Sequence, residues 1–522
     1  MFTRTKKTMW QILCLGMLFC LNGLLFAIPC SAQTTPKGKI VVISSENFQM
    51  NGGDCHTASG SGAALISNLI HEGLVKMASD GRMVPALAKS WQFSKDGLSI
   101  RFTLNERAKF HNGEPVTAKD VKFSLERAMR PELKYTRAGV LQRSIDRIEV
   151  MDDHNLTVYL KLPLPAFFDL STKHLGIVPN AYVEKVGDSE FAKHPIGAGP
   201  FKWVDYQQDV FVKVEAVPDH YRKPPSVKSV EIKFIGEDAT IMAMFKAGEA
   251  DVVMLPLPTY VQVKDDPKFR VVWSKFVQGP SLVFFDLAFP NEPSPFHDMQ
   301  VRRAASYAIN RKAICEKILH GAAEPWGDVL APYQPGCNPN LKPYPYDPEK
   351  AKALLKEAGY PNGFDTTIPY GFPGSKPESQ AIAADLARVG IRAKLVELEF
   401  GAYTRAVREK KLRGLGRYSN PYWGGYLHPG SSLDSTLSSL VFWSYVTTPE
   451  ADAAWQKLCG LTDEKAIAAQ AKEASQIWRE SEIRYMLWAL HQPFGLSPRV
   501  KSFKPTPGWL QICGLEFLEL ND

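Results

Sequence analysis

The clearest pattern of hydrophobic and polar positions lies in the segment 88–128. Its apolar residues Ile100, Phe102 and Leu104 alternate with polar residues, as in a strand with one buried face. Asparagine and glycine follow at 112–113, a pair that favours a tight turn because glycine accepts a positive φ without a steric cost. The first half of this segment therefore predicts a strand followed by a turn.

The second half of the segment predicts a capped helix. Thr117 and Asp120 have the spacing of a capping box, with aspartate where glutamate or glutamine is usual. Apolar residues between Val121 and Ala128 then recur at helical spacing, and Pro131 ends the pattern.

Similar patterns along the chain predict further elements. A short apolar run at 39–44 indicates a buried strand, and the segment 60–77 indicates a helix. Strands are expected at 156–162 and 211–217, and a helix at 237–248.

Two later helices carry clear start and stop signals. Asp347 and Pro348 supply an N-cap and a first-turn proline, and Gly359 ends that helix. Thr462 is expected to start another helix, whose apolar face runs from Ile467 to Trp478. Strands that alternate with helices favour an α/β protein with two lobes.

The N-terminus differs from the rest of the chain. Three basic residues precede an almost uncharged apolar run at 9–28, and small residues lead up to Ala32. These features predict a signal peptide over residues 1–32 that is cleaved after Ala32. The alternative is an uncleaved membrane anchor, because the run is long for a signal peptide. Lipid attachment at Cys30 is disfavoured because Pro29 precedes it, where a lipobox needs a small residue.

Composition excludes several classes of protein. The formal charge of +7 falls to about +4 without the leader, and the basic residues are interspersed with acids, so no nucleic-acid partner is expected. Five of the eight cysteines lie beyond the leader, which allows at most two disulfides and leaves one free thiol. These five are Cys55, Cys315, Cys337, Cys459 and Cys513.

Motifs for catalysis are absent from the sequence. It contains no Walker A loop, no H-E-x-x-H, no C-x-x-C and no G-x-S-x-G. Gly197–Gly199 is too short for a dinucleotide fingerprint and predicts a turn. His71 and Glu72 lack the second histidine of a zinc protease and are expected as a solvated helix pair. We therefore predict a protein that is not an enzyme and has no cofactor.

One tight cluster carries side chains that can bind metals. Asp54, Cys55 and His56 are adjacent, but a third ligand from elsewhere in the chain is not evident. A loop role, or a half-disulfide at Cys55, is the alternative to a metal site, and we expect no metal.

The segment 88–128 also resembles the signature of the bacterial extracellular solute-binding proteins of the peptide/nickel type, family 5. Members of that family are the substrate-binding subunits of ABC importers. Four further blocks are similar to the family in the expected order. They lie at 194–203, 241–254, 301–323 and 344–365.

The resemblance implies a type II periplasmic-binding-protein fold of the α/β class, with an extra inserted subdomain. Its two lobes would close by a hinge over an interlobe cleft. Mapped onto this chain, lobe I takes 36–75, 198–288 and 490–522. The inserted subdomain takes 76–197, and lobe II takes 289–489.

The resemblance also implies a function. The chain is expected to be a periplasmic, monomeric protein that captures a small solute, by default a short peptide. It would deliver the solute to a membrane permease that works with a separate ATPase subunit. The same role for a non-peptide ligand (an opine, a sugar derivative, a metal chelate or haem) is an alternative. A periplasmic hydrolase and a ligand-sensing partner of a receptor are further alternatives.

The segment 417–445 holds seven aromatic residues and suits a cleft wall that packs on a ligand, although ordinary core packing explains such rings equally well. In the family this block contains a W-x-x-D-Y-x-x-P pattern, whose Asp accepts the ammonium of a bound peptide. Pro429 sets the register, which places Tyr422 at the Trp, Gly425 at the Asp and Tyr426 at the Tyr. The carboxylate is therefore missing here.

Asp286 stands where the family commonly has Asn, so it is a candidate for the replacement carboxylate or else a helix- or loop-satisfied acid. Some dipeptide-binding members hold the ligand carboxylate with an Arg in the loop that corresponds to 370–379, where this chain offers only Lys376. The predicted ligand-binding residues are Asp54, His56, Gln278, Phe285, Asp286, Tyr422, Trp423, Gly425, Tyr426 and His428.

Overall fold

A computed structural model describes residues 38–521, except for 46, 47, 49, 59, 60, 79, 81, 162–165, 174, 373, 421–427, 440–443 and 508–513. Pro36–Asp522 forms one compact unit. The predicted signal peptide lies outside the described residues. Within the described part of the chain, no helix combines the length and apolarity that a membrane span needs.

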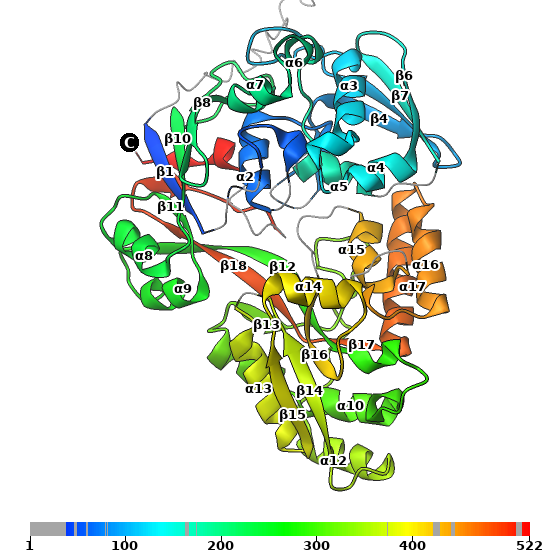
Figure 1. The fold of residues 1–522 in the computed structure, drawn as a ribbon. Helices are drawn as coiled ribbons and strands as arrows, with labels where there is room; N and C mark the ends of the chain where they lie inside the picture. Colours follow the sequence, from blue (N-terminus) through cyan, green and yellow to red (C-terminus); the bar gives the residue numbers. More distant parts are fainter. Residues whose placement is uncertain are drawn as a thin grey trace, which may run out of the picture. The chain divides into compact units, whose positions relative to one another are not determined.

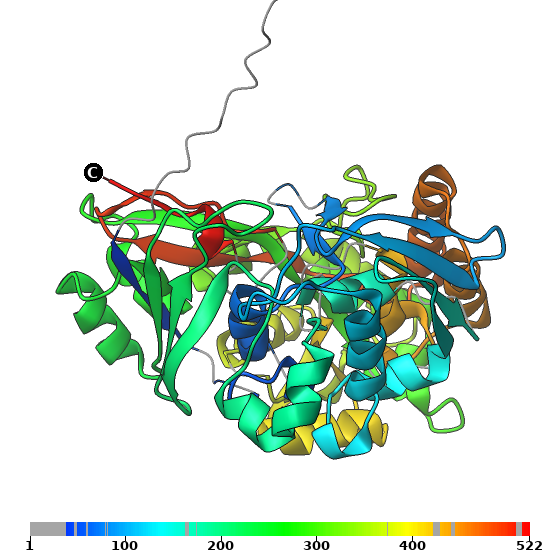
Figure 2. The same cartoon turned by 90° about the horizontal axis from the view of Figure 1, so that it is seen from above.

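A mixed sheet of ten strands takes its strands from the beginning, the middle and the end of the chain (Figures 1 and 2). In spatial order its strands are β16 (Leu415–Asn420), β12 (Arg270–Phe284), β18 (Trp488–Leu496), β11 (Val252–Met254), β1 (Lys39–Ser44), β10 (Ser229–Phe234), β9 (Phe211–Ala216) and β8 (Phe201–Gln207). Two short strands extend it: β13 (Ala323–Pro325) pairs with β18, and β17 (Arg484–Met486) pairs with β12.

Strand β1 has the bounds that its apolar run predicts. It lies between β10 and β11 and is parallel to both. Ile40 and Val42 pack into one hydrophobic cluster, whereas Ile43 packs into a second cluster. Because both faces of this strand are covered, its sequence is a continuous apolar run and does not alternate.

The segment 88–128 folds as predicted. Strand β5 (Ser99–Leu104) buries its alternate apolar residues in a four-stranded antiparallel sheet with the order β4-β5-β7-β6. The partner strands are β4 (Ala88–Phe93), β7 (Asn155–Leu160) and β6 (Ile145–Val150). Gly113 has a φ of 89°, as the turn requires.

Helix α3 (Ala118–Ala128) starts at its predicted cap. The Asp120 carboxylate accepts hydrogen bonds from the backbone N–H of Thr117 at 2.9 Å and from its hydroxyl at 2.7 Å. Val121 and Leu125 are fully buried on the apolar face.

The helix predicted over 60–77 is shorter than expected. Helix α2 (Ser61–Ile70) ends at Ile70, and β2 (Val75–Met77) pairs with β3 (Met83–Pro85). His71 and Glu72 are buried, not solvated. Glu72 pairs with Arg222 at 3.0 Å and makes a backbone bridge to Ile177, so tertiary contacts end the helix.

The chain between the short helix η4 (Pro295–His297) and β17 forms smaller α/β and helical layers. Strands β14 (Phe364–Tyr370) and β15 (Ile391–Glu397) pair in parallel, joined by α13 (Lys376–Ala387). Helix α10 (Met299–Ala308) packs against α12 (Pro348–Glu357), and α16 (Pro449–Cys459) packs against α17 (Glu464–Ser481) (Figure 1).

The predicted starts and ends of the two capped helices in this part are largely confirmed. The Asp347 side chain accepts from Lys350 N–H at 2.9 Å at the start of α12, and Gly359 beyond its end has a φ of 87°. Helix α17 is capped by Asp463, one residue later than predicted. The boundaries of the lobes and of the inserted subdomain stay a prediction.

The predicted turn at Gly197–Gly199 packs against the end of α2. A Cβ atom at Gly199 would lie 2.6 Å from the Leu69 carbonyl oxygen, and the Gly199 N–H donates to the Ile70 carbonyl at 2.8 Å. Only glycine fits this close backbone approach.

We expect Gly199→Ala to lower the free energy of unfolding by about 1–3 kcal/mol, because the added methyl group forces the turn away from α2. Gly236→Ala is the matched control, since a Cβ there meets nothing within 4 Å. Urea unfolding of both variants measures the difference. Equal stabilities would contradict the close-packing argument.

Candidate ligand-binding site

The loop that follows β1 places Asp54 against a buried arginine. Asp54 caps the short helix η1 (Cys55–Thr57) by accepting from the His56 N–H at 3.0 Å. Its two carboxylate oxygens also accept from the Nη1 and Nη2 groups of Arg127 in α3, at 2.9 Å and 2.6 Å. Arg127 is fully buried and also donates to Asp188 at the start of α7 (Asp188–Lys193).

Both nitrogens of the His56 ring are engaged inside the protein. Nδ1 lies 2.9 Å from Nη1 of Arg127, and Nε2 lies 2.9 Å from the Gly176 carbonyl oxygen. A guanidinium group can only donate, so Nδ1 accepts and Nε2 carries the proton. Burial, together with the charge of Arg127, lowers the pKa of His56 to about 3, and the ring is neutral at pH 7.

These contacts favour the loop role of the cluster over a metal site. The candidate ligand atoms of Asp54, Cys55 and His56 lie within 4.8 Å of one another. The Arg127 guanidinium, however, already supplies the positive charge at this point. Burial would raise the pKa of Asp54, but the hydrogen bonds and charge of Arg127 outweigh it and hold that pKa below its usual value. Burial raises the pKa of the Cys55 thiol, which disfavours the thiolate that a metal needs.

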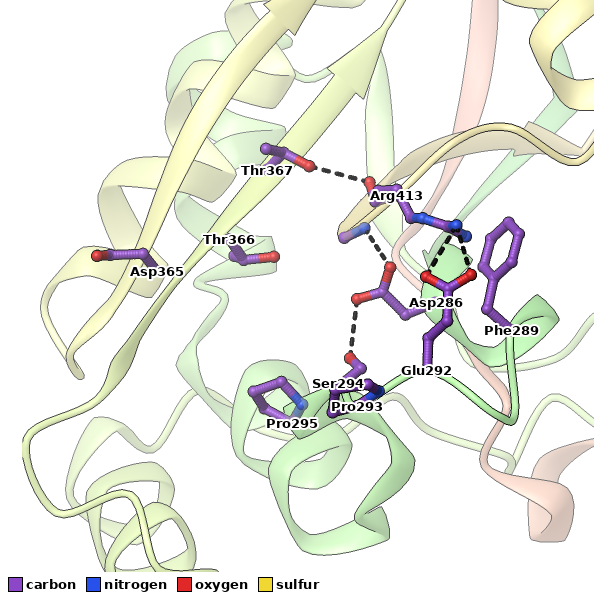
Figure 3. Close-up of a pocket in the computed structure, with 11 residues that line it drawn as sticks. Asp286, Phe289, Glu292, Pro293, Ser294, Pro295, Asp365, Thr366, Thr367 and Arg413 are labelled. Atoms are coloured by element: carbon purple, nitrogen blue, oxygen red, sulfur yellow. Dashed lines mark hydrogen bonds and ion pairs between the residues drawn. The ribbon is translucent and has the colours of Figure 1, made fainter.

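Asp286 lines a hollow of about 330 Å³ beside strand β14 (Figure 3). It belongs to the short helix η3 (Phe285–Ala288). One carboxylate oxygen accepts from the Gly414 N–H at 2.8 Å, and the other accepts from the Ser294 hydroxyl at 2.8 Å. Asp286 thus joins two loops, which is the alternative that the sequence left open.

The other charges of this hollow are paired. Arg413 Nη2 donates to both oxygens of Glu292 at 3.0 Å, and the guanidinium of Arg413 lies over the ring of Phe289 (Figure 3). Asp365 pairs with Arg392 at 2.6 Å. Any ligand cation in this hollow would therefore compete with internal hydrogen bonds.

The aromatic segment 417–445 is described by the structure except for residues 421–427 and 440–443. Tyr418 in β16 is buried, and its ring packs on the ring of Phe285, which also contacts Tyr445. Phe285 thus lies in a hydrophobic cluster. The candidates Tyr422, Trp423, Gly425 and Tyr426 lie outside the described residues.

Two further candidates lie on regular elements. His428 caps helix α15 (Pro429–Leu437), where its Nδ1 accepts from the Gly430 N–H at 3.0 Å. Burial lowers the pKa of His428 to about 4. Gln278 is half-buried on β12, opposite Leu490 of β18.

One buried ion pair at the start of the segment 417–445 was not predicted from the sequence. Arg417 Nε donates to Glu378 at 2.5 Å. Glu378 lies in the first turn of α13, which begins at Lys376 and not after Ser379. The proline at 377, followed by an acid, was the available signal for this helix start. Lys376 itself pairs with Glu397 at 2.9 Å.

We expect Arg127→Leu to lower the free energy of unfolding by about 3–5 kcal/mol, because it leaves the Asp54 carboxylate buried without its cation. Arg130→Leu is the control from the same helix end. Arg130 lies over the ring of Phe123, a contact worth about 1 kcal/mol or less. Chemical unfolding compares the two variants, and similar losses would show that the buried pair is not a major contribution.

Burial lowers the pKa of His56 in the folded protein. As the pH falls, the His56 ring is therefore protonated in the unfolded chain at a higher pH than in the folded protein. The contribution of His56 to stability is therefore complete above about pH 6.5 and declines as the pH falls towards 3. We expect His56→Asn, which keeps an acceptor for Arg127, to flatten the pH dependence by up to about 1.4 kcal/mol per pH unit. Unfolding curves between pH 7.5 and 4.5 test this, and parallel wild-type and variant profiles would refute it.

Comparisons with known proteins support the resemblance. Residues 82–441 match the family described as "Bacterial extracellular solute-binding proteins, family 5 Middle". Heme-binding protein A of Haemophilus influenzae is 30% identical over 460 residues, which cover 81% of this chain and 82% of that protein. Glutathione-binding protein GsiB of Pectobacterium atrosepticum is 27% identical over 473 residues, which cover 88% of this chain and 90% of that protein.

Solved structures have the same fold. HbpA2 from Haemophilus parasuis matches with a TM-score of 0.80 at 23% identity, over 93% of this chain and 100% of that chain. The periplasmic binding protein DppA from Helicobacter pylori, in complex with the peptide STSA, matches with a TM-score of 0.74 at 24% identity, over 94% and 99% of the two chains. The predicted type II periplasmic-binding-protein fold is confirmed. The chain belongs to the bacterial extracellular solute-binding proteins of family 5, the substrate-binding components of ABC importers that work with a permease and an ATPase.

Proposed function

We propose that this chain is exported to the periplasm, loses residues 1–32, and captures a short peptide or peptide-like solute as a monomer. It then delivers the solute to a membrane permease coupled to a separate ATPase subunit. The observation that carries this proposal is the family match over residues 82–441, together with relatives that align over four fifths of the chain. Capture by closure of two lobes follows from the same relationship.

The paired strands β12 and β18 support the proposed division into lobes. The predicted boundary at 489/490 falls within β18, and β12 ends at Phe284, four residues before the boundary at 288/289. Two long antiparallel strands that pass between lobes are suited to a hinge, because they bend without breaking their ladder. We propose this strand pair as the hinge.

The protein is proposed to bind its ligand without chemical turnover. Cys55, Cys315, Cys337 and Cys459 are free thiols, whereas Cys513 lies outside the described residues. Burial raises the pKa of Cys315 and of Cys337 to about 12, so neither is a ready nucleophile at pH 7.

A short peptide is the first ligand candidate. Support comes from the relatives named as glutathione-binding proteins and from the neighbouring structure that holds the peptide STSA. Within this chain we propose as the ligand-contacting residues Gln278, Tyr422, Trp423, Gly425, Tyr426 and His428. The internal contacts of Asp54, His56 and Phe285 favour structural roles, and Asp286 is left as a secondary candidate.

A non-peptide ligand is the second candidate, and one observation favours it. The chain has Gly425 where the resemblance expects the carboxylate that receives a peptide ammonium. A buried ammonium without a partner is costly, so peptides that depend on this contact would bind weakly. The relatives include a protein named as heme-binding, and the neighbouring structures include complexes with Ni(L-His) and with agropinic acid.

A thermal-shift screen of the chain from residue 33 onward tests both candidates. The probes are reduced glutathione, dipeptides, longer peptides, hemin, Ni²⁺-histidine, sugars and opines. A ligand present at 100 times its Kd adds about 2.7 kcal/mol of stability, so we expect a peptide probe to raise the melting temperature by a few degrees.

The pattern of shifts decides between the proposals. A shift with a non-peptide probe alone would replace the peptide proposal by the second candidate. If the melting temperature rises only after the protein has converted a probe into a product, the proposed absence of turnover would be contradicted. No shift with any probe at millimolar concentration would contradict capture of this whole group of solutes.

A further inference from the structure

Strand β12 contains a bulge opposite the centre of β18. Ser274 pairs with Gln492, and Gln278 pairs with Leu490. Four residue steps of β12 thus face two steps of β18, and the bulge places two extra residues in β12. Gln278, a proposed ligand contact, is the first paired residue after the bulge, so its position depends on how the bulge is held.

The bulge contains a strained residue that is bonded to a histidine. Phe276 has a φ of 57°, in the left-handed region that bulky residues rarely adopt. Its backbone N–H donates to Nδ1 of His491 in β18 at 3.1 Å. Since Nδ1 accepts this bond, the proton of the neutral ring lies on Nε2, which is 3.3 Å from Oε1 of Glu324 in β13.

Aromatic rings surround this histidine. Its ring centroid lies 5.3 Å from that of Phe276 and 6.5 Å from that of Trp273. The Phe276 ring also packs edge-on against Trp326 at 5.2 Å. The half-buried His491 thus contacts both the backbone and the ring of Phe276.

The charged groups that face His491 are few. Burial and the charge of Lys275 on β12 favour the neutral form of its ring, whereas Glu324 on β13 and a hydrogen bond to the Leu490 backbone favour the protonated form. On the third neighbouring element, α9 (Leu257–Val263), Tyr260 packs on Trp273. Burial has the largest effect and lowers the pKa of His491, so the ring accepts the Phe276 hydrogen bond at pH 7.

We propose that His491 is a proton-sensitive positioning residue, whose neutral form holds the β12 bulge and thereby places Phe276 and Gln278. A second proton can enter the ring only at Nδ1. An N–H group at Nδ1 then faces the N–H of Phe276, and the hydrogen bond that holds the left-handed residue is lost. Protonation of His491 at low pH therefore breaks its hydrogen bond to the bulge, while its ion pair with Glu324 remains.

The consequence for ligand capture rests on the proposed function: solute affinity falls as the bulge opens. The bulge itself exists without any ligand. A test on the ligand-free protein therefore separates failure of this inference from failure of the proposed function.

Amide hydrogen exchange of the wild type, His491→Asn and His491→Ala tests the inference at pH 7.5 and pH 5.0, with labelling times scaled for the intrinsic exchange rate. Asn places an amide oxygen near the position of Nδ1 and does not titrate. In the wild type we expect protection of 274–278 to fall by about tenfold or more at the lower pH. In His491→Asn it should change less than twofold, and in His491→Ala it should be low at both pH values.

Strand β5 (Ser99–Leu104) is the internal control, because it reports any loss of global stability in acid. The inference is overturned if wild-type protection of 274–278 falls no more than that of β5, or if His491→Asn follows the wild-type profile. If His491→Ala does not fold, the comparison of His491→Asn with the wild type still decides.

Discussion

The buried guanidinium of Arg127 joins helix α3 to the loop after β1 and to the start of α7. It pairs with Asp54 in the loop after β1, with Asp188 at the start of α7, and with the imidazole of His56. A buried charge is tolerated only when its hydrogen bonds are complete, so these segments must adopt their positions together. This side chain adds a polar link to the hydrophobic core that the four-stranded sheet and the large mixed sheet share, since α3 packs on the first sheet and β1 belongs to the second.

Local signals predicted those elements whose determinants lie within a few residues. Strand β1, helix α3 and helix α12 follow their apolar periods and caps, because the same residues decide the backbone and the buried face. Helix α2 does not extend to Met77, since Glu72 leaves the helix to pair with Arg222, 150 residues away. The apolar period of 60–77 carries no information about that partner.

The candidate site was harder to predict for the same reason. Asp54 and His56 are adjacent to Cys55, which suggested a metal cluster, but their actual partner is Arg127, more than 70 residues later. Asp286 was recognised as an unusual acid, yet its bond to Gly414 spans 128 residues. Hydrogen bonds of this length decide whether a carboxylate is available to a ligand, and only a folded chain reveals them. The segment 422–426, which carries the departure from the family pattern, lies outside the described residues.

The order of strands in the large sheet also determines when during synthesis the sheet can be completed. Strand β18, which pairs with both β11 and β12, is formed by residues 488–496 of a chain of 522. Until β18 is synthesised, the strands β11 and β12, made more than 200 residues earlier, lack the partner that pairs with both of them. Pairings of such high sequence separation form slowly, so the incomplete chain stays open. Under the proposed export to the periplasm, this delay would favour passage through a narrow membrane channel, because the large sheet stays incomplete until β18 is synthesised.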